Sequence, residues 1–215
     1  MRLLVLLGLA SVLAAPAAAA SPVRPLTGAE RSLVTRAGFY HRGCPVALSQ
    51  LRVLTVRHWG FDHRAHTGQL VVNAKDARAL KTVFAKLFRL RFPIRHMQLS
   101  DIYGRAVPRD GDVTASFECR QAAASPCTGL GNTRTGSWSN HAYGLALDLN
   151  PVENPYVGCG QTRDRTAVSY MNRSHVRPGM VTPAVVRAFA SIGWGWGGAW
   201  AGSTKDYMHF SWNGH

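Results

Sequence analysis

Ser139-Asn140-His141-Ala142-Tyr143-Gly144-Leu145-Ala146-Leu147-Asp148-Leu149-Asn150 is the stretch on which the fold prediction rests. A histidine precedes a glycine, and an alternating strand then carries one aspartate. Because strand side chains alternate between faces, the leucines share one face and the aspartate lies on the other. Gly144 allows a sharp turn that brings His141 toward Asp148. The stretch therefore predicts a histidine and an aspartate held close together. They are either metal ligands or a polar strand face with a hydrogen-bonded histidine.

A second segment, residues 205–212 (Lys-Asp-Tyr-Met-His-Phe-Ser-Trp), supplies another acid and another histidine. A catalytic zinc ion takes three nitrogen or oxygen ligands and keeps a position open for water. His141, Asp148 and His209 are the predicted ligands. Asp206 lies three residues before His209, so a flat strand would turn the two side chains to opposite faces. We therefore expect Asp206 in the turn entering this strand, where it reaches the site as a general base. A surface ion pair with Lys205 is the alternative.

Composition indicates a folded, exported chain. The 215 residues are 46% hydrophobic and only 17% charged, which suits one domain with a real core. Residues 1–20 combine Arg2, a short apolar run and a group of alanines, the pattern of a secretory signal peptide. An uncleaved anchor is the alternative. No later stretch is long enough for a transmembrane span.

The charge balance favours an anionic partner. The formal net charge is +14, and it becomes +13 when Arg2 leaves with the signal peptide. Outside a cell the candidates are wall polymers, peptidoglycan carboxylates, anionic lipid or stray nucleic acid. A generic basic surface is the alternative. No nucleic-acid-binding motif is present, so nucleic acid is not a predicted partner.

Four cysteines lie beyond the predicted signal peptide, at positions 44, 119, 127 and 159. An even number in an oxidising compartment predicts two disulfides. The absence of a Cys-x-x-Cys pair argues against a cysteine zinc site. The sequence alone leaves three connectivities open.

Periodicity and caps predict the elements of one domain. Helices are expected over residues 28–37, from an Asn73 cap to Pro93, and from Thr182 to Gly193. Strands are expected over residues 51–58, 70–72, 94–103, 114–117, 144–150 and 207–212, and loops over 120–138 and 154–180. Five apolar residues form the stripe of the second helix: Leu80, Val83, Phe84, Leu87 and Phe88.

The two motif segments together resemble the M15 zinc peptidases. The shared pattern is Ser-x-His-x-x-Gly-x-Ala-x-Asp (139–148) followed by Asp-x-x-His (206–209). That family contains D-alanyl-D-alanine carboxypeptidases and L-alanyl-D-glutamate peptidases acting on bacterial peptidoglycan. Further segments are similar to its secreted branch: residues 61–62, 68–73, 92–94, 116–120, 150–156, 177–180 and 193–198.

The resemblance implies a fold and a division of the chain. The fold is α+β, a single domain whose mainly antiparallel sheet is flanked by helices, of the Hedgehog/DD-peptidase-like zinc-binding type. Residues 21–43 would form a lead-in with a short helix, and residues 44–215 the peptidase domain. Relatives carry equivalents of Cys44 and Cys119 only. This implies a Cys44–Cys119 bond and leaves Cys127–Cys159 as a second one, with a local Cys119–Cys127 bond as the alternative.

The resemblance also assigns roles. His141, Asp148 and His209 would bind Zn²⁺ and Asp206 would be the catalytic base. Family members hold the substrate with an arginine from a Tyr-Arg-Ser segment, which this chain lacks; residues 101–105 (Asp-Ile-Tyr-Gly-Arg) stand near that place. Arg120 is the candidate instead, because its fork suits a carboxylate or oxyanion. A structural salt bridge beside Cys119 is the alternative.

The implied function is zinc-dependent hydrolysis of peptidoglycan stem peptides, at D-Ala-D-Ala or at L-Ala-D-Glu. The expected protein is a monomer that is secreted or associated with the cell wall. A non-catalytic, zinc-containing wall-binding module is the alternative. Three tryptophans are candidates for lining a cleft or packing in the core: Trp194, Trp196 and Trp200. Three other histidines have no metal-ligand pattern and are read as ordinary surface or strand residues: His58, His63 and His66.

Overall fold

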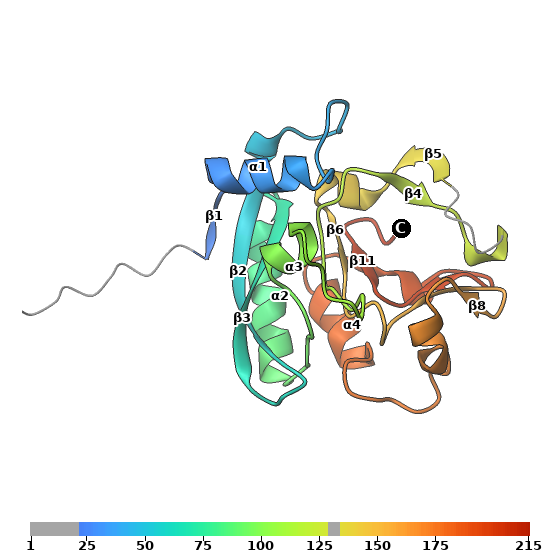
Figure 1. Cartoon of the computed structure of the whole chain (residues 1–215). Coiled ribbons are helices and arrows are strands. Elements are labelled where there is room, and N and C mark those ends of the chain that lie inside the picture. Colours follow the sequence, from blue (N-terminus) through green and yellow to red (C-terminus); the bar gives the residue numbers. More distant parts are fainter. Residues whose placement is uncertain (1–21, 129–133) are drawn as a thin grey trace, which may run out of the picture.

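The computed structural model describes residues 22–128 and 134–215 (Figure 1). The predicted signal peptide, residues 1–20, lies outside the described residues. The described chain is a mixed α+β structure in which every strand pairing is antiparallel. Its strands form four small sheets, ordered β1-β2-β3, β10-β7-β8, β6-β11-β9 and β4-β5. The prediction of one sheet is therefore wrong, because most strands are only two to five residues long and turns separate them.

The largest sheet is built on the predicted hairpin. β2 (Leu51–Trp59) pairs with β3 (Ala65–Asn73) over its full length, and β1 (Val23–Pro25) pairs with the other edge of β2. Val53, Leu70 and Val72 are fully buried. Figure 1 shows α2 against this hairpin, which thus forms one wall of the core.

Two of the three predicted helices begin where expected. α1 (Gly28–Arg36) has a capping box between Thr27 and Glu30. α4 (Pro183–Ala190) starts with proline at its first position. α2 (Ala77–Arg89) instead begins after Asp76. The predicted cap, Asn73, ends β3: its side chain accepts from the Lys75 amide (3.0 Å) in the turn between strand and helix.

The apolar stripe of α2 is largely confirmed. Leu80, Val83, Phe84 and Leu87 are buried, whereas Phe88 is half-buried and stacks on Trp59.

Residues 94–103 do not form the predicted strand. They end in a short helix, α3 (Leu99–Tyr103), which buries Ile102 and Tyr103. The Asp101 carboxylate accepts a hydrogen bond from the Gln98 amide at 2.9 Å. This capping interaction fixes the helix start and outweighs the apolar alternation that suggested a strand.

Several other short segments also differ from the prediction. Residues 114–117 contribute only an isolated bridge, Ala115 to Asp148. Two predicted loops contain hairpins, β4 (Gln121–Ala123) with β5 (Arg134–Trp138) and β7 (Tyr156–Gly158) with β8 (Gln161–Thr162). The described residues also form five 3-10 helices: η1 (Leu48–Gln50), η2 (Pro126–Thr128), η3 (Asn140–Tyr143), η4 (Arg165–Tyr170) and η5 (Gly197–Ala199).

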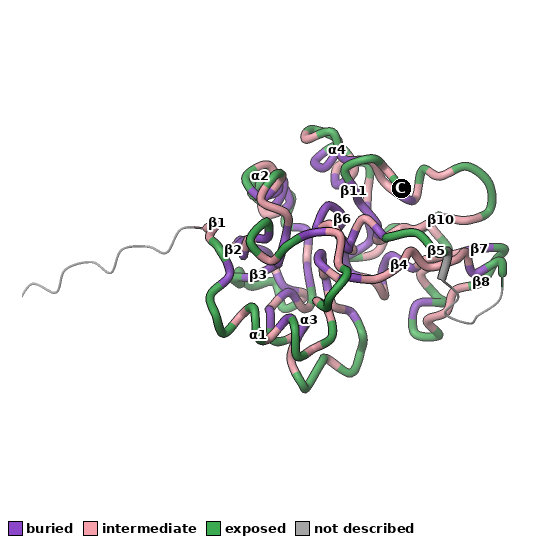
Figure 2. Tube along the Cα trace, turned by 90° about the horizontal axis from the view of Figure 1, so that it is seen from above, coloured by how far each residue is buried: buried purple, intermediate pink, exposed green. Residues whose placement is uncertain are grey.

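A small central sheet carries the predicted functional segments. β6 (Ala146–Asp148) and β9 (Gly195–Trp196) lie on either side of β11 (His209–Ser211). Figure 2 shows buried residues running along β6 and β11. Phe210 of β11 is fully buried and stacks on Phe189 of α4 with centroids 3.8 Å apart. The sheet is thus anchored in the core by its apolar side.

Both disulfides implied by the resemblance are present. Cys44 bonds Cys119 and Cys127 bonds Cys159, with Cα–Cα distances of 5.7 and 5.1 Å. Two disulfides indicate an oxidising, extracytoplasmic environment. Among the described residues, no helix has the length and apolar character that crossing a membrane would require.

Candidate metal centre

His141 is held at the start of the site by a one-turn helix and a glycine. The Ser139 hydroxyl caps η3 by accepting from the His141 amide (3.3 Å). Gly144 ends the turn with φ +64°, and a Cβ atom there would lie 2.8 Å from the backbone nitrogen of Asn73. The sequence therefore needs glycine at this position both for its conformation and for its close approach to β3.

Asp148 and His209 are brought together by strand pairing. They are direct partners in the antiparallel register of β6 and β11. Directly opposite residues of an antiparallel pair present their side chains on the same face. Leu147 and Phe210 are the next pair, and both are fully buried on the other face. The apolar face thus fixes which side the aspartate and the histidine point to.

Three side chains converge on one point. His141 Nε2 lies 3.2 Å from Asp148 Oδ2, and His209 Nδ1 lies 3.2 Å from Asp148 Oδ1. The two inward ring nitrogens, His141 Nε2 and His209 Nδ1, are themselves 3.2 Å apart. These are the three residues whose spacing in the sequence predicted the site.

The hydrogen bonds of the outer nitrogens fix the tautomers of both rings. His141 Nδ1 donates to the Ser116 carbonyl (2.6 Å), and His209 Nε2 donates to the His215 carbonyl (3.2 Å). Since a carbonyl oxygen only accepts, the inward nitrogens of the neutral rings carry lone pairs. Two lone pairs and a carboxylate facing one another fit a bound cation. Two imidazole nitrogens and a carboxylate, with main-chain carbonyls behind the rings, are a donor set typical of catalytic zinc.

Burial and the charges of the site shift the pKa values of its side chains. Burial would raise the pKa of Asp148, but His141 and His209 outweigh it and hold that pKa well below its usual range. Burial likewise lowers the pKa of His209, but the hydrogen bond that Asp148 accepts from it and the negative charges of Asp148 and Asp206 together outweigh burial, so the pKa is raised. Asp148 is therefore a carboxylate at neutral pH, as a metal ligand must be.

Asp206 does not lie in a turn, as predicted, but in the two-residue strand β10 (Lys205–Asp206) opposite Tyr156 of β7. A bend at Tyr207 and Met208 separates β10 from β11, and it lets Asp206 and His209 line the same cleft. The prediction that Asp206 lies outside the His209 strand is therefore confirmed, but Asp206 belongs to a short strand of its own and not to a turn. Its Oδ1 atom is buried and has no hydrogen-bond partner among the described residues. Burial, reinforced by the negative charge of Asp148, raises the pKa of Asp206 to about 7.

Arg120 combines the two roles that the sequence left open. Its Nε donates to the Glu118 carboxylate (2.7 Å), which is the predicted salt bridge. Its side chain also lines the cleft beside the metal-binding group. Burial lowers its pKa, but Glu118 and then Asp148 outweigh this, so the pKa of Arg120 is raised. The guanidinium is thus a permanent positive charge at the edge of the site.

The cleft has a volume of about 390 Å³ and is formed by parts of the chain that are far apart in the sequence. It is lined by Arg120, Ala122, Ala123, Trp138, Ser139, Asn140, His141, Asp148, Tyr156, Trp200, Asp206, Met208, His209, Asn213 and His215. Of the three candidate tryptophans, Trp200 lines the cleft, whereas Trp194 is buried and donates to the Asp76 carboxylate (2.9 Å).

The remaining predicted histidines lie elsewhere. His58 stacks on His66, and His66 bonds the Asp62 carboxylate at 2.9 Å. Neither belongs to a metal-binding group among the described residues.

The sequence did not single out Trp138, Tyr156, Asn213 or His215 as cleft residues. They reach the cleft through the β4–β5 hairpin, through β7, and through the turn after β11. Trp138, Asn213 and His215 lie outside the segments that resemble the family. Tyr156 ends one of these segments, residues 150–156, but nothing in that segment indicates that it lines the cleft. Only the pairing of Tyr156 with Asp206 reveals that both belong to one site.

Comparison with known proteins supports the same site. Residues 133–212 match a family model described as D-alanyl-D-alanine carboxypeptidase, of the M15 peptidases. This segment carries an M15 peptidase domain. The match spans all three converging residues and Asp206, and it confirms the resemblance read from the motifs. Searches of curated proteins and of solved structures return no match.

Proposed function

We propose that the protein is a secreted zinc metallopeptidase that hydrolyses peptide bonds in the stem peptides of bacterial peptidoglycan. The observation that carries the proposal is the convergence of two lone-pair nitrogens and a carboxylate, from His141, His209 and Asp148, beside a cleft. These residues would hold Zn²⁺. The M15 match over the same segment supplies the peptidase class and supports a DD-peptidase-like fold.

When bound in such a site, zinc acidifies a water molecule and polarises the scissile carbonyl. Asp206 is the general base of the proposed reaction. Its buried Oδ1 has no hydrogen-bond partner in the part of the chain that the structure describes, so it is available to accept a proton from the attacking water. Its pKa, raised to about 7 by burial, suits both accepting that proton and returning it to the leaving amine.

Arg120 would bind the charged or developing negative end of the substrate. It lines the cleft, and its Glu118 partner has a side chain that is 40% exposed. The Nε–Glu118 bond fixes the plane of the guanidinium and leaves its Nη2 atom without a hydrogen bond to the described residues. A fixed fork of this kind suits the carboxylate of a stem peptide or an oxyanion.

The setting proposed from the sequence is consistent with this chemistry. The predicted signal peptide and the two disulfides support export. The net charge of +13 beyond Arg2 supports attraction to an anionic wall polymer. We propose that residues 21–43 form a lead-in to a peptidase domain over residues 44–215, and that the protein acts as a monomer on peptidoglycan.

Defined muropeptides test the activity and the bond. Purified protein with zinc is incubated with a pentapeptide-containing muropeptide, and the products are weighed. Loss of one alanine identifies a D-Ala-D-Ala carboxypeptidase, whereas release of the stem from its first alanine identifies an L-Ala-D-Glu endopeptidase. If zinc-loaded protein cleaves no muropeptide while still binding sacculi, the non-catalytic wall-binding alternative replaces the peptidase.

A further inference from the structure

The turn after β11 packs against both segments that carry the candidate metal ligands. We define the tail segment as residues 212–215 (Trp-Asn-Gly-His). Figure 1 shows the end marked C beside β6 and β11. Asn213 and His215 of the tail segment line the cleft.

On one side, the tail segment is tied to Asn140, the residue before His141. The Asn140 amide group donates to Asn213 Oδ1 (2.7 Å) and also to the His215 carbonyl. In return, Trp212 Nε1 donates to Asn140 Oδ1 at 3.2 Å. Both ends of the Asn140 amide are therefore used to hold the turn that positions His141.

On the other side, the tail segment is tied to β11 and its neighbours. The Ser211 hydroxyl donates to the His215 carbonyl at 2.8 Å, and Trp200 Nε1 donates to the Gly214 carbonyl at 2.5 Å. A Cβ atom on Gly195 of β9 would lie 2.6 Å from the Gly214 Cα. The tail backbone is thus packed against the sheet at van der Waals contact.

Asn213 is the centre of this arrangement. Its Oδ1 atom accepts from Asn140 Nδ2, from the Ser211 hydroxyl (3.3 Å) and from the His215 amide (3.1 Å). These bonds close the turn and direct the His215 carbonyl back toward the site. That carbonyl is the acceptor for His209 Nε2.

We propose that the tail segment is a positioning element of the metal centre. Its His215 carbonyl fixes the tautomer and the ring orientation of His209, so that Nδ1 faces the metal position. Through Asn213 and Asn140, it also holds the turn that carries His141 at a fixed distance from His209. The inference rests on the proposed function only in requiring that the site binds zinc.

The test measures zinc affinity by competition with a chromophoric chelator, on the full chain. Two variants are compared with wild type, Asn213→Ala and a deletion of residues 213–215. Outer partners of metal-binding histidines typically change metal affinity by roughly 10- to 100-fold, and a loss of this size is expected for both variants. The matched control is Asn172→Ala, an exposed asparagine that only closes a local turn with Ser174; its zinc affinity should equal that of wild type.

Two further measurements distinguish this positioning role of the tail segment from a purely structural role. The ¹⁵N NMR shifts of the His209 ring report which nitrogen carries the proton, and in metal-free wild type, at a pH where the ring is neutral, this should be Nε2. In the deletion variant that preference should be lost. Unfolding temperatures with and without zinc show whether the variants fold; a folded variant with wild-type zinc affinity and an unchanged tautomer overturns the proposal. If wild type itself binds no zinc, the proposed function fails instead.

Discussion

His141 Nε2 and His209 Nδ1 face each other across 3.2 Å, although each ring donates its other N–H to a main-chain carbonyl. No proton is left to lie between them when both rings are neutral. The Asp148 carboxylate adds two more acceptor atoms at 3.2 Å. Without a cation, this arrangement favours a second proton on one of the rings. The raised pKa of His209 beside Asp148 agrees with this.

We therefore expect that His141→Ala removes bound zinc. Purified wild type should contain about one zinc per chain, and the variant close to none, because two remaining ligands do not hold a catalytic zinc. Elemental analysis after dialysis measures this. His175→Ala, at an exposed position outside the site, is the control and should keep its metal. A zinc content that is unchanged by His141→Ala would rule out the proposed centre.

Asp206→Asn should abolish most of the activity while leaving zinc in place. Loss of a general base costs roughly 10²–10⁴ in rate, and Asp206 is not one of the three converging ligands. The rate on muropeptides and the zinc content are measured together. Asp164→Asn is the control, because Asp164 caps η4 and lies outside the cleft.

The same carboxyl group sets an expected pH dependence. Burial raises the pKa of Asp206 to about 7, and a nearby cation would lower it by favouring the charged form. The general base acts only when deprotonated, so kcat/KM should fall as pH falls through this group's pKa. Asp206→Asn should lack this acidic limb in its residual activity. An acidic limb retained in the variant would assign it to another group.

Arg120→Ala should lower kcat/KM on muropeptides by roughly 10²–10³, the usual cost of removing a donor to a developing oxyanion. Glu118→Gln distinguishes the two roles of Arg120, because it weakens the 2.7 Å salt bridge but keeps the guanidinium in the cleft. If both variants lose activity equally, the arginine acts through its salt bridge. If only Arg120→Ala loses activity, it contacts the substrate. Zinc content should be unchanged in both.

The sequence predicted the long helices and strands better than the short ones. The β2–β3 hairpin and three helices follow from long periodic patterns and caps, which local chemistry determines. The paired strands β4–β5 and β7–β8 have too few residues for a periodic signal. Their pairing depends on contacts distant in the sequence, and so the loops predicted there were wrong.

In the candidate site, too, local motifs were predicted from the sequence and contacts between distant segments were not. Residues 139–148 and 206–209 could be recognised because turn, strand alternation and ligand types coincide within a few residues. The strand Lys205–Asp206 was missed because it pairs with β7, whose Tyr156 lies 50 positions before Asp206 in the chain. The contact between the His215 carbonyl and His209 involves a backbone atom. Every residue type has this backbone atom, so the sequence does not predict the contact.

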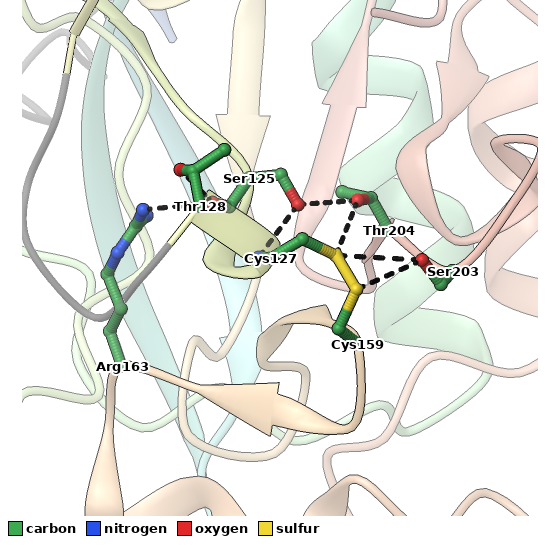
Figure 3. The surroundings of a disulfide bond; sticks show 7 residues. All are labelled: Ser125, Cys127, Thr128, Cys159, Arg163, Ser203 and Thr204. Atoms are coloured by element: carbon green, nitrogen blue, oxygen red, sulfur yellow. Dashed lines mark hydrogen bonds between the residues drawn. A yellow bond between two sulfur atoms is a disulfide. The ribbon is translucent and has the colours of Figure 1, made fainter.

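The second disulfide should matter for stability and for the cleft. Figure 3 shows Cys127–Cys159 beside Ser125, Ser203 and Thr204, where η2, the β7–β8 turn and the segment before β10 meet. Replacing both cysteines by serine should lower the free energy of unfolding by about 2–4 kcal/mol, measured in urea. Because β7 and β10 carry Tyr156 and Asp206, activity should fall while zinc content stays. Unchanged unfolding and unchanged activity would show that the bond supports neither.

A buried ion-pair cluster away from the metal centre predicts a pH-dependent stability. Glu153 is fully buried, and one of its oxygens accepts from Arg95 at 2.8 Å. Burial, and next the neighbouring Asp112 carboxyl, raise the pKa of Glu153 to about 7. The folded state therefore holds a proton that the unfolded chain releases near pH 4.5. As pH rises between these two values, the contribution of Glu153 to stability is lost.

Glu153→Gln mimics the protonated form and should remove this loss. Relative to wild type, the metal-free variant should gain unfolding free energy as pH rises from 5 to 8, by on the order of 1–3 kcal/mol. Glu30→Gln is the contrasting control, because the Arg24 hydrogen bond lowers the pKa of Glu30 to about 2. Above pH 5 it should lower the stability by a constant amount and leave the slope from pH 5 to 8 as in wild type, and this difference should shrink as pH falls below 5. Parallel wild-type and Glu153→Gln curves over that range would show that Glu153 is ionised throughout, with Arg95 outweighing burial.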